Sequence, residues 1–159
     1  MIAGMDPERE FLRHTVATLA YRAARAVNGA PDDFAGFGGA GRTPGEILAH
    51  MGDLFDWALS IAQGREAWHN SKPLPWPEEK RRFFAALAAF DEYLAGMEPI
   101  HGDLKRLFQG PVADALTHTG QVAMLRRLAG YKIPGENYYV AHIEAGQTGD
   151  DQPVAMKTF

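Results

Sequence analysis

The sequence contains no cysteine. This absence excludes disulfide bonds, thiolate metal ligands and a cysteine nucleophile within the chain. No run of apolar residues approaches the roughly 18 that a membrane-spanning helix needs. The stretch at residues 6–10 is acidic and no long apolar run follows it in the first 30 residues, so we expect no secretory signal. These features together favour a cytoplasmic protein.

The sequence also lacks a strong excess of either charge, with 16 Lys and Arg against 20 Asp and Glu and a net charge of −4. Nucleic acids and anionic membrane surfaces are bound through clustered basic residues. Only short basic clusters occur, at residues 80–82 and 126–127. We therefore predict neither a nucleic acid nor a membrane as a partner. A hydrophobic content of 46% over 159 residues suits a single domain, residues 1–159, with a real core.

Four segments carry apolar residues at helical spacing. We expect the helices at about residues 7–27, 44–62, 78–94 and 111–129. Asp6 is placed to cap the first helix, and Thr43 with Glu46 forms a capping box for the second. Four such helices predict an all-α four-helix bundle.

The remaining segments have weaker signals. The Gly-rich stretch GFGGAG at residues 36–41 is only superficially similar to a phosphate-binding loop, because no strand precedes it and no GK[ST] ends it. It is interpreted as a flexible connection. The tail at 131–159 shows no clear helix, and Tyr138, Tyr139 and Val140 favour an extended conformation there. We thus expect a partly extended C-terminal tail.

A carboxylate and an imidazole lie four residues apart on the last predicted helix, at Asp114 and His118. They share one helical stripe with Gln121 and two leucines, Leu125 and Leu128, so they are predicted to face inward. His50 shares a stripe of the second helix with Leu54 and Trp57. Three titratable side chains from two helices are therefore expected to converge.

Burying an unpaired carboxylate is costly, and a divalent cation removes that cost. Two imidazoles and one carboxylate are a common ligand set for zinc with an open position, and for nonhaem iron or nickel. We predict His50, Asp114 and His118 as metal ligands. The alternatives are an ordinary helix-surface pair and a hydrogen-bonded core histidine. The other histidines, His14, His69, His101 and His142, are interpreted as surface, loop or tail residues.

The predicted pocket beside the metal is lined by residues in phase with its ligands. These are Met51, Leu54, Trp57 and Gln121. Trp57 is interpreted as a core aromatic or pocket wall. Gln121 is placed either to hydrogen-bond a group at the metal or to make a plain interhelical contact.

Two stretches of the sequence, TPGEILAHMGDLFDWAL at 43–59 and DALTHTGQVAMLRRLAG at 114–130, together resemble the DinB/YfiT-like superfamily of metal-binding four-helix bundles. That family typically has one His on its second helix and a His-x-x-x-His-x-Gly-Gln pattern on a later one. His50 matches the former, and His118, Gly120 and Gln121 match the end of the latter. Asp114 stands where many members have the first His, and mycothiol-dependent isomerases, which look related, use a carboxylate there.

The resemblance implies a divalent metal, often zinc or nickel, in a bundle with up-down-down-up connections that is frequently a homodimer. It also implies a small-molecule substrate. Members of the family include metal-dependent hydrolases and transferases or isomerases that use a low-molecular-weight thiol as a cofactor. Both activities are hypotheses for this chain. The alternative is a non-enzymatic small-ligand-binding bundle whose metal site is structural or vestigial.

Overall fold

The computed structural model describes residues 4–39 and 41–159, and these residues form an all-α fold. Residues 1–3, and Ala40 within the Gly-rich loop, lie outside the described residues. Four helices are long and a short one precedes the last: α1 (Pro7–Val27), α2 (Pro44–Ala62), α3 (Trp76–Ala95), α4 (Leu104–Leu107) and α5 (Ala113–Leu128). No described helix is long and apolar enough to cross a membrane.

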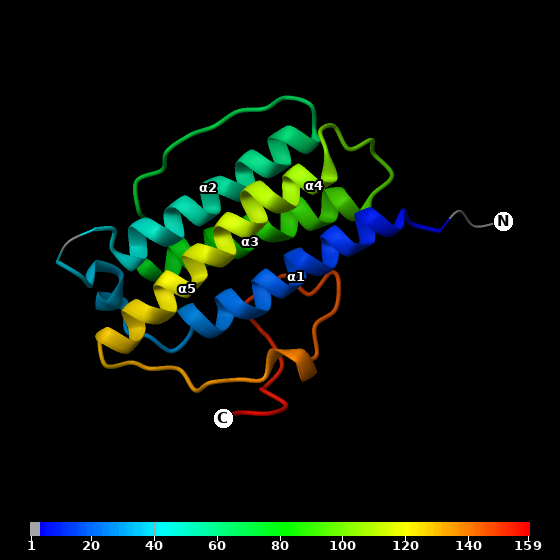
Figure 1. Cartoon of the computed structure of the whole chain (residues 1–159). Coiled ribbons are helices and arrows are strands. Elements are labelled where there is room, and N and C mark those ends of the chain that lie inside the picture. The colour runs from blue at the N-terminus through cyan, green and yellow to red at the C-terminus, as the bar shows by residue number, and fades with distance from the viewer. Residues whose placement is uncertain (1–3, 40) are drawn as a thin grey trace.

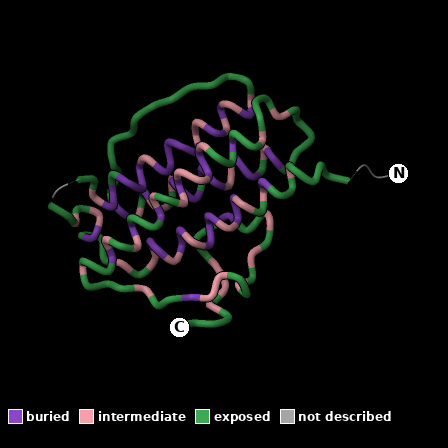
Figure 2. The backbone as a smooth tube through the Cα atoms, in the orientation of Figure 1, coloured by how far each residue is buried: buried purple, intermediate pink, exposed green. Residues whose placement is uncertain are grey.

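The long helices pack around a shared core. Both α1 and α2 contact α3 on one side and α5 on the other. Figure 1 shows α2 and α3 running in the same direction, joined by a loop, residues 63–75, that returns along the length of α2. The buried residues in Figure 2 lie mainly where the helices face one another. Fully buried examples are Val16, Leu48, Phe55, Phe83 and Leu87.

The first two helices have the predicted bounds because local capping sets their starts. The Asp6 carboxylate accepts a hydrogen bond of 3.0 Å from the Glu8 N–H, and Pro7 occupies the first turn, where its missing N–H costs nothing. At α2, the Glu46 N–H donates to Thr43 Oγ1 at 3.2 Å and the Thr43 N–H donates to the Glu46 carboxylate at 2.8 Å. The predicted capping box is confirmed.

The third helix begins at Trp76, two residues before the predicted start at residue 78. Pro75 is its N-cap and Pro77 falls in its first turn, where proline is tolerated. Trp76 is buried and meets the ring of Phe34 edge-on at 5.6 Å. Phe34 belongs to a 3-10 helix, Asp32–Gly36. The connection between α1 and α2 is therefore anchored in its first half by a buried aromatic pair.

The last long helix does not begin at Pro111 after a Gly110 cap, as predicted. The chain is helical without a break from α4, through a π-helical turn at Phe108–Val112, into α5. Pro111 lies inside that turn. A proline ring within an α-helix clashes with the carbonyl four residues earlier, and a wider turn relieves the clash. Proline here widens the helix instead of starting it.

The buried face of α5 also differs from the predicted stripe. Ala115, Thr119, Val122 and Arg126 are its buried residues, whereas Leu128 is 66% exposed. Two of the four buried side chains are polar. The hydrophobic pattern of the sequence therefore did not indicate this face as the buried one. The Arg126 guanidinium donates to the carbonyls that end α1, including that of Ala26 at 3.1 Å. Such a partner satisfies carbonyls that a helix end leaves free.

The tail lies against α1, as Figure 1 shows. The predicted extended stretch at Tyr138–Val140 is wrong: these residues form a 3-10 turn, and Asn137 caps it by accepting from the Tyr139 N–H at 3.1 Å. The described tail offers only one antiparallel bridge, between Glu136 and Thr158, so no neighbouring strand stabilises a pleated conformation. The buried Glu136 carboxylate accepts from the Arg25 guanidinium at 2.9 Å and fastens the tail.

Arg82 links α3 to α2 at a glycine. Its Nη1 donates to the Ala49 carbonyl at 2.8 Å, and its Nη2 bonds to the Asp53 carboxylate. The guanidinium crosses α2 directly over Gly52. A Cβ atom added at Gly52 would lie 2.2 Å from Arg82 Nη1, well inside any allowed contact. Gly52 is thus required by the close approach of Arg82.

We expect Gly52→Ala to lower the free energy of unfolding by about 1–3 kcal/mol, since the new methyl group displaces the guanidinium and leaves the buried Asp53 carboxylate without that partner. Urea unfolding of the variant beside the wild type measures the change.

The matched control is Gly120→Ala on α5, where an added Cβ meets nothing within 4 Å. It is expected to raise stability slightly, because alanine favours a helix more than glycine does. If Gly52→Ala is as stable as Gly120→Ala, Arg82 does not depend on the glycine.

Candidate metal centre

The three predicted ligand residues lie together in the structure. His50 comes from α2, and Asp114 and His118 come from α5. The Nε2 atom of His50 is 3.5 Å from Asp114 Oδ2, and the Nε2 atom of His118 is 3.4 Å from Asp114 Oδ1. One donor atom from each residue fits within 4.8 Å of the others. Helical spacing predicted that these three side chains converge, and this placement is confirmed. Metal binding by them stays a prediction.

These separations suit a small divalent ion. With metal–ligand bonds of about 2.0–2.2 Å in a tetrahedral arrangement, the donor atoms lie roughly 3.3–3.6 Å apart. Each imidazole is at such a distance from one oxygen of Asp114, His50 from Oδ2 and His118 from Oδ1, and one donor atom from each of the three residues lies within 4.8 Å of the others. The donor set, two imidazoles and one carboxylate, leaves one tetrahedral position for another ligand.

The three side chains lie at the surface between α2 and α5 and not in the core. His50 and His118 line one hollow, and Asp114 lines an adjoining smaller one. The exposed fractions are 22% for His50, 13% for His118 and 46% for Asp114. The expectation that they face inward is therefore wrong for Asp114, because the buried face of α5 is the adjacent stripe containing Ala115 and Thr119. A half-exposed carboxylate does not require a metal to offset the cost of burial. Metal binding is therefore supported by the geometry of the donors alone.

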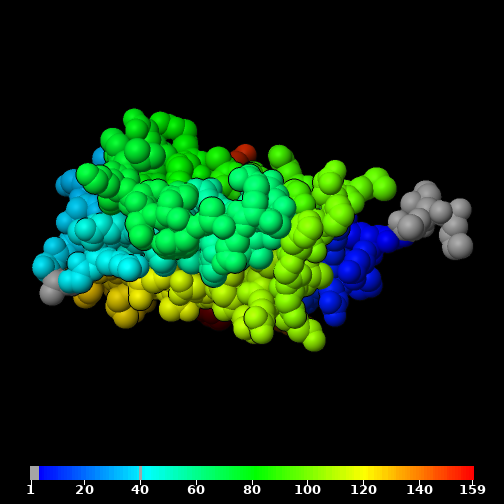
Figure 3. All heavy atoms as spheres, turned by 90° about the horizontal axis from the view of Figure 1, so that it is seen from above, coloured from blue at the N-terminus to red at the C-terminus, as the bar shows by residue number. Residues whose placement is uncertain are grey.

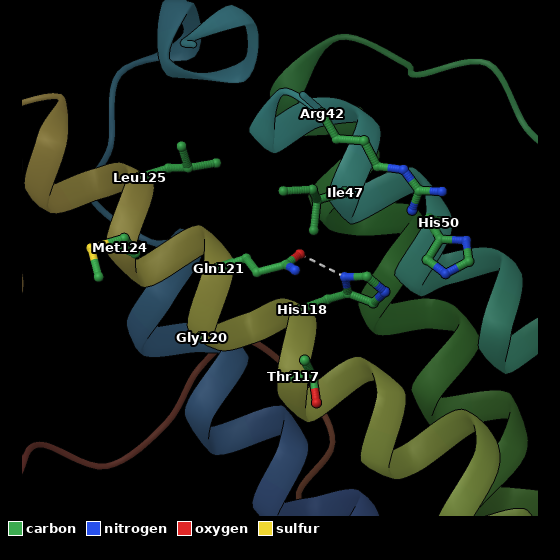
Figure 4. Close-up of a pocket in the computed structure, with 9 residues that line it drawn as sticks. All are labelled: Arg42, Ile47, His50, Thr117, His118, Gly120, Gln121, Met124 and Leu125. Carbon is green, nitrogen blue, oxygen red and sulfur yellow. Dashed lines mark hydrogen bonds between the residues drawn. The ribbon is translucent and has the colours of Figure 1, made fainter. Parts of the chain in front are cut away.

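Gln121 orients one of the imidazoles. The Nδ1 atom of His118 lies 2.8 Å from Gln121 Oε1, and the dashed line in Figure 4 marks this contact. An amide oxygen can only accept, so the His118 Nδ1–H donates. That tautomer leaves the lone pair on Nε2, the atom that faces Asp114. Metal-binding histidines are commonly held in this way through the second ring nitrogen.

His50 is kept neutral by its surroundings. Burial lowers the pKa of His50 below its ordinary value, and the proximity of His118 and Arg42 lowers it further, against an opposing effect of Asp114. A neutral imidazole has a free lone pair at neutral pH, which a metal ligand requires.

Trp68, a loop residue that the sequence analysis did not identify, forms part of the wall of the site beside His50. The ring of Trp68 meets His50 edge-on at 5.8 Å and meets Trp57 edge-on at the same distance. Trp57 in turn donates its indole N–H to Glu66 at 3.1 Å. Figure 3 shows the loop, residues 63–75, lying over α2, with α5 along one edge. No short sequence spacing links residue 68 to the site, because the loop must fold back first.

The four predicted pocket residues lie in three different places: the main hollow, a smaller hollow and the core. Gln121 lines the hollow with His50 and His118, a space of about 830 Å³. Leu54 and Trp57 line a smaller hollow on the other side, together with Asp114. Met51 does not line the site: it is 1% exposed and belongs to the core.

A second group of possible donors lies beneath the same loop. Asp53, Asp56 and His69 offer atoms within 4.8 Å of one another. The Arg82 guanidinium already occupies the space between the two carboxylates, at 2.9 Å from Asp56. The Ser71 N–H also donates to Asp53 at 2.8 Å. We call these residues the Arg82 cluster: Asp53, Asp56, His69, Ser71 and Arg82. We interpret the cluster as the set of contacts that hold the loop against α2.

Asp53 gives this cluster a pH dependence. Burial alone raises the pKa of Asp53, but hydrogen bonds from Ser71 and Arg82 outweigh burial and hold that pKa below its ordinary value of 3.8. A carboxylate with a lowered folded-state pKa contributes stability that is complete above its ordinary value. That contribution is lost as the pH falls through the folded-state pKa.

We expect Asp53→Asn to lower the free energy of unfolding at neutral pH by about 1–3 kcal/mol. It should also speed hydrogen exchange in residues 63–75. The difference from the wild type should shrink as the pH falls from 3.8 through the lower folded-state pKa of Asp53, since below that pKa both proteins carry a neutral side chain. Denaturant unfolding and exchange mass spectrometry across this range test the expectation. Asp151→Asn in the exposed tail is the control, and a similar effect there would contradict the role of Asp53.

Comparison of the chain with protein-family models, with curated proteins and with solved structures finds no significant match.

Proposed function

We propose that this protein is a metal-dependent enzyme acting on small organic molecules, with His50, Asp114 and His118 as the ligands of a divalent ion such as zinc or nickel. The observation that carries the proposal is the convergence of three ligand residues from two helices, with each imidazole 3.4 or 3.5 Å from an oxygen of the Asp114 carboxylate. A closed structural zinc site uses four protein ligands. Among the described residues this group contains three, which favours a site with an open position.

The surrounding residues support the same use. Gln121 holds the His118 tautomer, the position of Trp68 limits access to His50, and the hollow beside them is large enough for a small molecule. A divalent ion held there would act as a Lewis acid toward a substrate oxygen or a small thiol. The residues of the chain would orient the ion and the substrate and exclude part of the water.

The lining of the hollow favours thiol transfer or isomerisation over hydrolysis. Among the described residues, no carboxylate lines the 830 Å³ hollow. Hydrolysis needs a group that removes a proton from the attacking water, and Asp114 is already committed as a ligand. A low-molecular-weight thiol loses its proton more readily than water does, so it needs no such base. The lack of cysteine in the chain is compatible with an external thiol.

The fold that we propose with this function is a DinB-like four-helix bundle with up-down-down-up connections. The proposal is supported by the two sequence stretches that carry the ligands, and by the long loop that joins α2 to α3. A homodimer and a cytoplasmic location, which the resemblance and the composition imply, stay predictions.

The ligand assignment predicts the metal content of four variants. His50→Ala, Asp114→Ala and His118→Ala should each lose near-stoichiometric zinc or nickel, because each removes a donor. Gln121→Ala should keep the site but weaken the affinity by about 10–100-fold, since His118 is no longer oriented. Elemental analysis and competition with a chelator measure both effects. The wild type and Gln121→Ala should release metal on acidification as the imidazoles bind protons.

The control is His14→Ala, which changes an exposed histidine of α1 and should bind metal as the wild type does. Equal metal content in all of these variants would place the site elsewhere. No metal in the wild type after incubation with zinc or nickel would leave a ligand-binding bundle as the better description.

The open position separates an enzyme from a binding protein with a structural metal. In cobalt-substituted protein, an added small thiol should change the visible absorption of the metal if a coordination position is open. The spectrum of a closed site should not respond. Thiol-dependent consumption of an electrophile would then support transfer or isomerisation, whereas thiol-independent cleavage of esters or amides would support hydrolysis.

A further inference from the structure

Arg42 reaches the candidate metal centre from the loop before α2. It directly precedes Thr43, the N-cap residue of α2, so the capping box holds its backbone in place. Figure 4 shows the side chain extending along α2, so that its guanidinium lies beside His50. It lines the same hollow as His50 and His118. A permanent positive charge is thereby placed next to the ligand residues.

Arg42 differs from the arginines that stabilise the fold. Arg9, Arg13, Arg25, Arg82 and Arg126 each donate hydrogen bonds to carbonyl or carboxylate oxygens. Across residues 4–39 and 41–159, the exposed Arg42 makes no hydrogen bond or ion pair through its side chain. Its five N–H donors remain available, and a guanidinium matches the two oxygens of a carboxylate or phosphate.

The other end of the hollow is apolar. Figure 4 shows Met124 and Leu125 from α5 at this end, away from Arg42, with Ile47 from α2 between them and Arg42. The volume of about 830 Å³ falls in the range of small-molecule sites. A charged end and an apolar end in one hollow suit a ligand with the same two parts.

We propose that the hollow binds small organic anions, with the anionic group on Arg42 and an apolar body against Ile47, Met124 and Leu125. The anion is a carboxylate or a phosphate, since both present paired oxygens to a guanidinium. Calling this anion the substrate rests on the proposed function. The binding itself requires only the residues of the hollow.

The test uses three eight-carbon probes: octanoate, octyl phosphate and octanol. Calorimetric titration of the wild-type protein, both zinc-loaded and metal-free, measures their dissociation constants at one pH and salt concentration. At least one anion should bind more tightly than octanol in both forms. Arg42→Gln should weaken that anion by about tenfold or more, as expected for loss of a hydrogen bond to a charged group. The affinity for octanol should not change.

Two further variants define the role of the guanidinium. Arg42→Lys keeps the charge but loses the paired donors, so an intermediate affinity is expected. Arg81→Gln removes an exposed arginine of α3 with the same change in net charge, and it should leave the affinity unchanged. The better of the two anions identifies the oxygen group that the site prefers. The inference is overturned if neither anion binds more tightly than octanol, or if Arg42→Gln and Arg81→Gln behave alike.

The same titrations separate this inference from the proposed function. Zinc binding by Arg42→Gln at wild-type affinity, with anion binding lost, supports both. Anion binding that depends on Arg42 in a protein that takes up no metal supports the anion site and contradicts the metal enzyme. Anion binding that needs zinc and is indifferent to Arg42 contradicts the anion site, since the metal alone then holds the anion.

Discussion

The guanidinium of Arg82 joins the parts of the molecule on which the candidate site depends. It extends from α3 across Gly52 to the Ala49 carbonyl of α2, and it meets the carboxylates of Asp53 and Asp56. The loop at residues 63–75 is bound to the same carboxylates, to Asp53 through Ser71 and to Asp56 through His69. That loop carries Trp68 to the ring of His50. The wall of the site is therefore held by an interaction between residues that do not line the hollow themselves.

Two more arginines join neighbouring helices, and both do so at helix ends. Arg9 donates to carbonyls at the end of α3, including that of Tyr93 at 3.1 Å, and Arg126 does the same at the end of α1. The last carbonyls of a helix have no partner within the helix, so a long cationic side chain from a neighbouring helix satisfies them and joins the two elements. The buried Arg126 has a lowered pKa because of burial. Much of the interhelical contact is thus polar, although the core itself is aliphatic and aromatic.

This use of polar residues explains what the sequence did and did not predict. The bounds of α1 and α2 followed from caps and prolines within a few residues, and the convergence of His50, Asp114 and His118 followed from helical spacing. The buried face of α5 did not, since its Thr119 and Arg126 resemble surface residues until their partners on other segments are known. Trp68 was missed for a related reason, because its place depends on the distant contacts of the Arg82 cluster.

The π-helical turn at Phe108–Val112 has a consequence for the direction of the ligands. The Ala113 N–H bonds to the Phe108 carbonyl, five residues back, so this turn holds one residue more than an α-helical turn. Each residue of an α-helix turns the chain by about 100°. The extra residue sets the angular offset between α4 and α5 along one continuous helical path. The face that α4 presents is therefore decoupled from the face that carries Asp114 and His118, and each can be suited to its own neighbours.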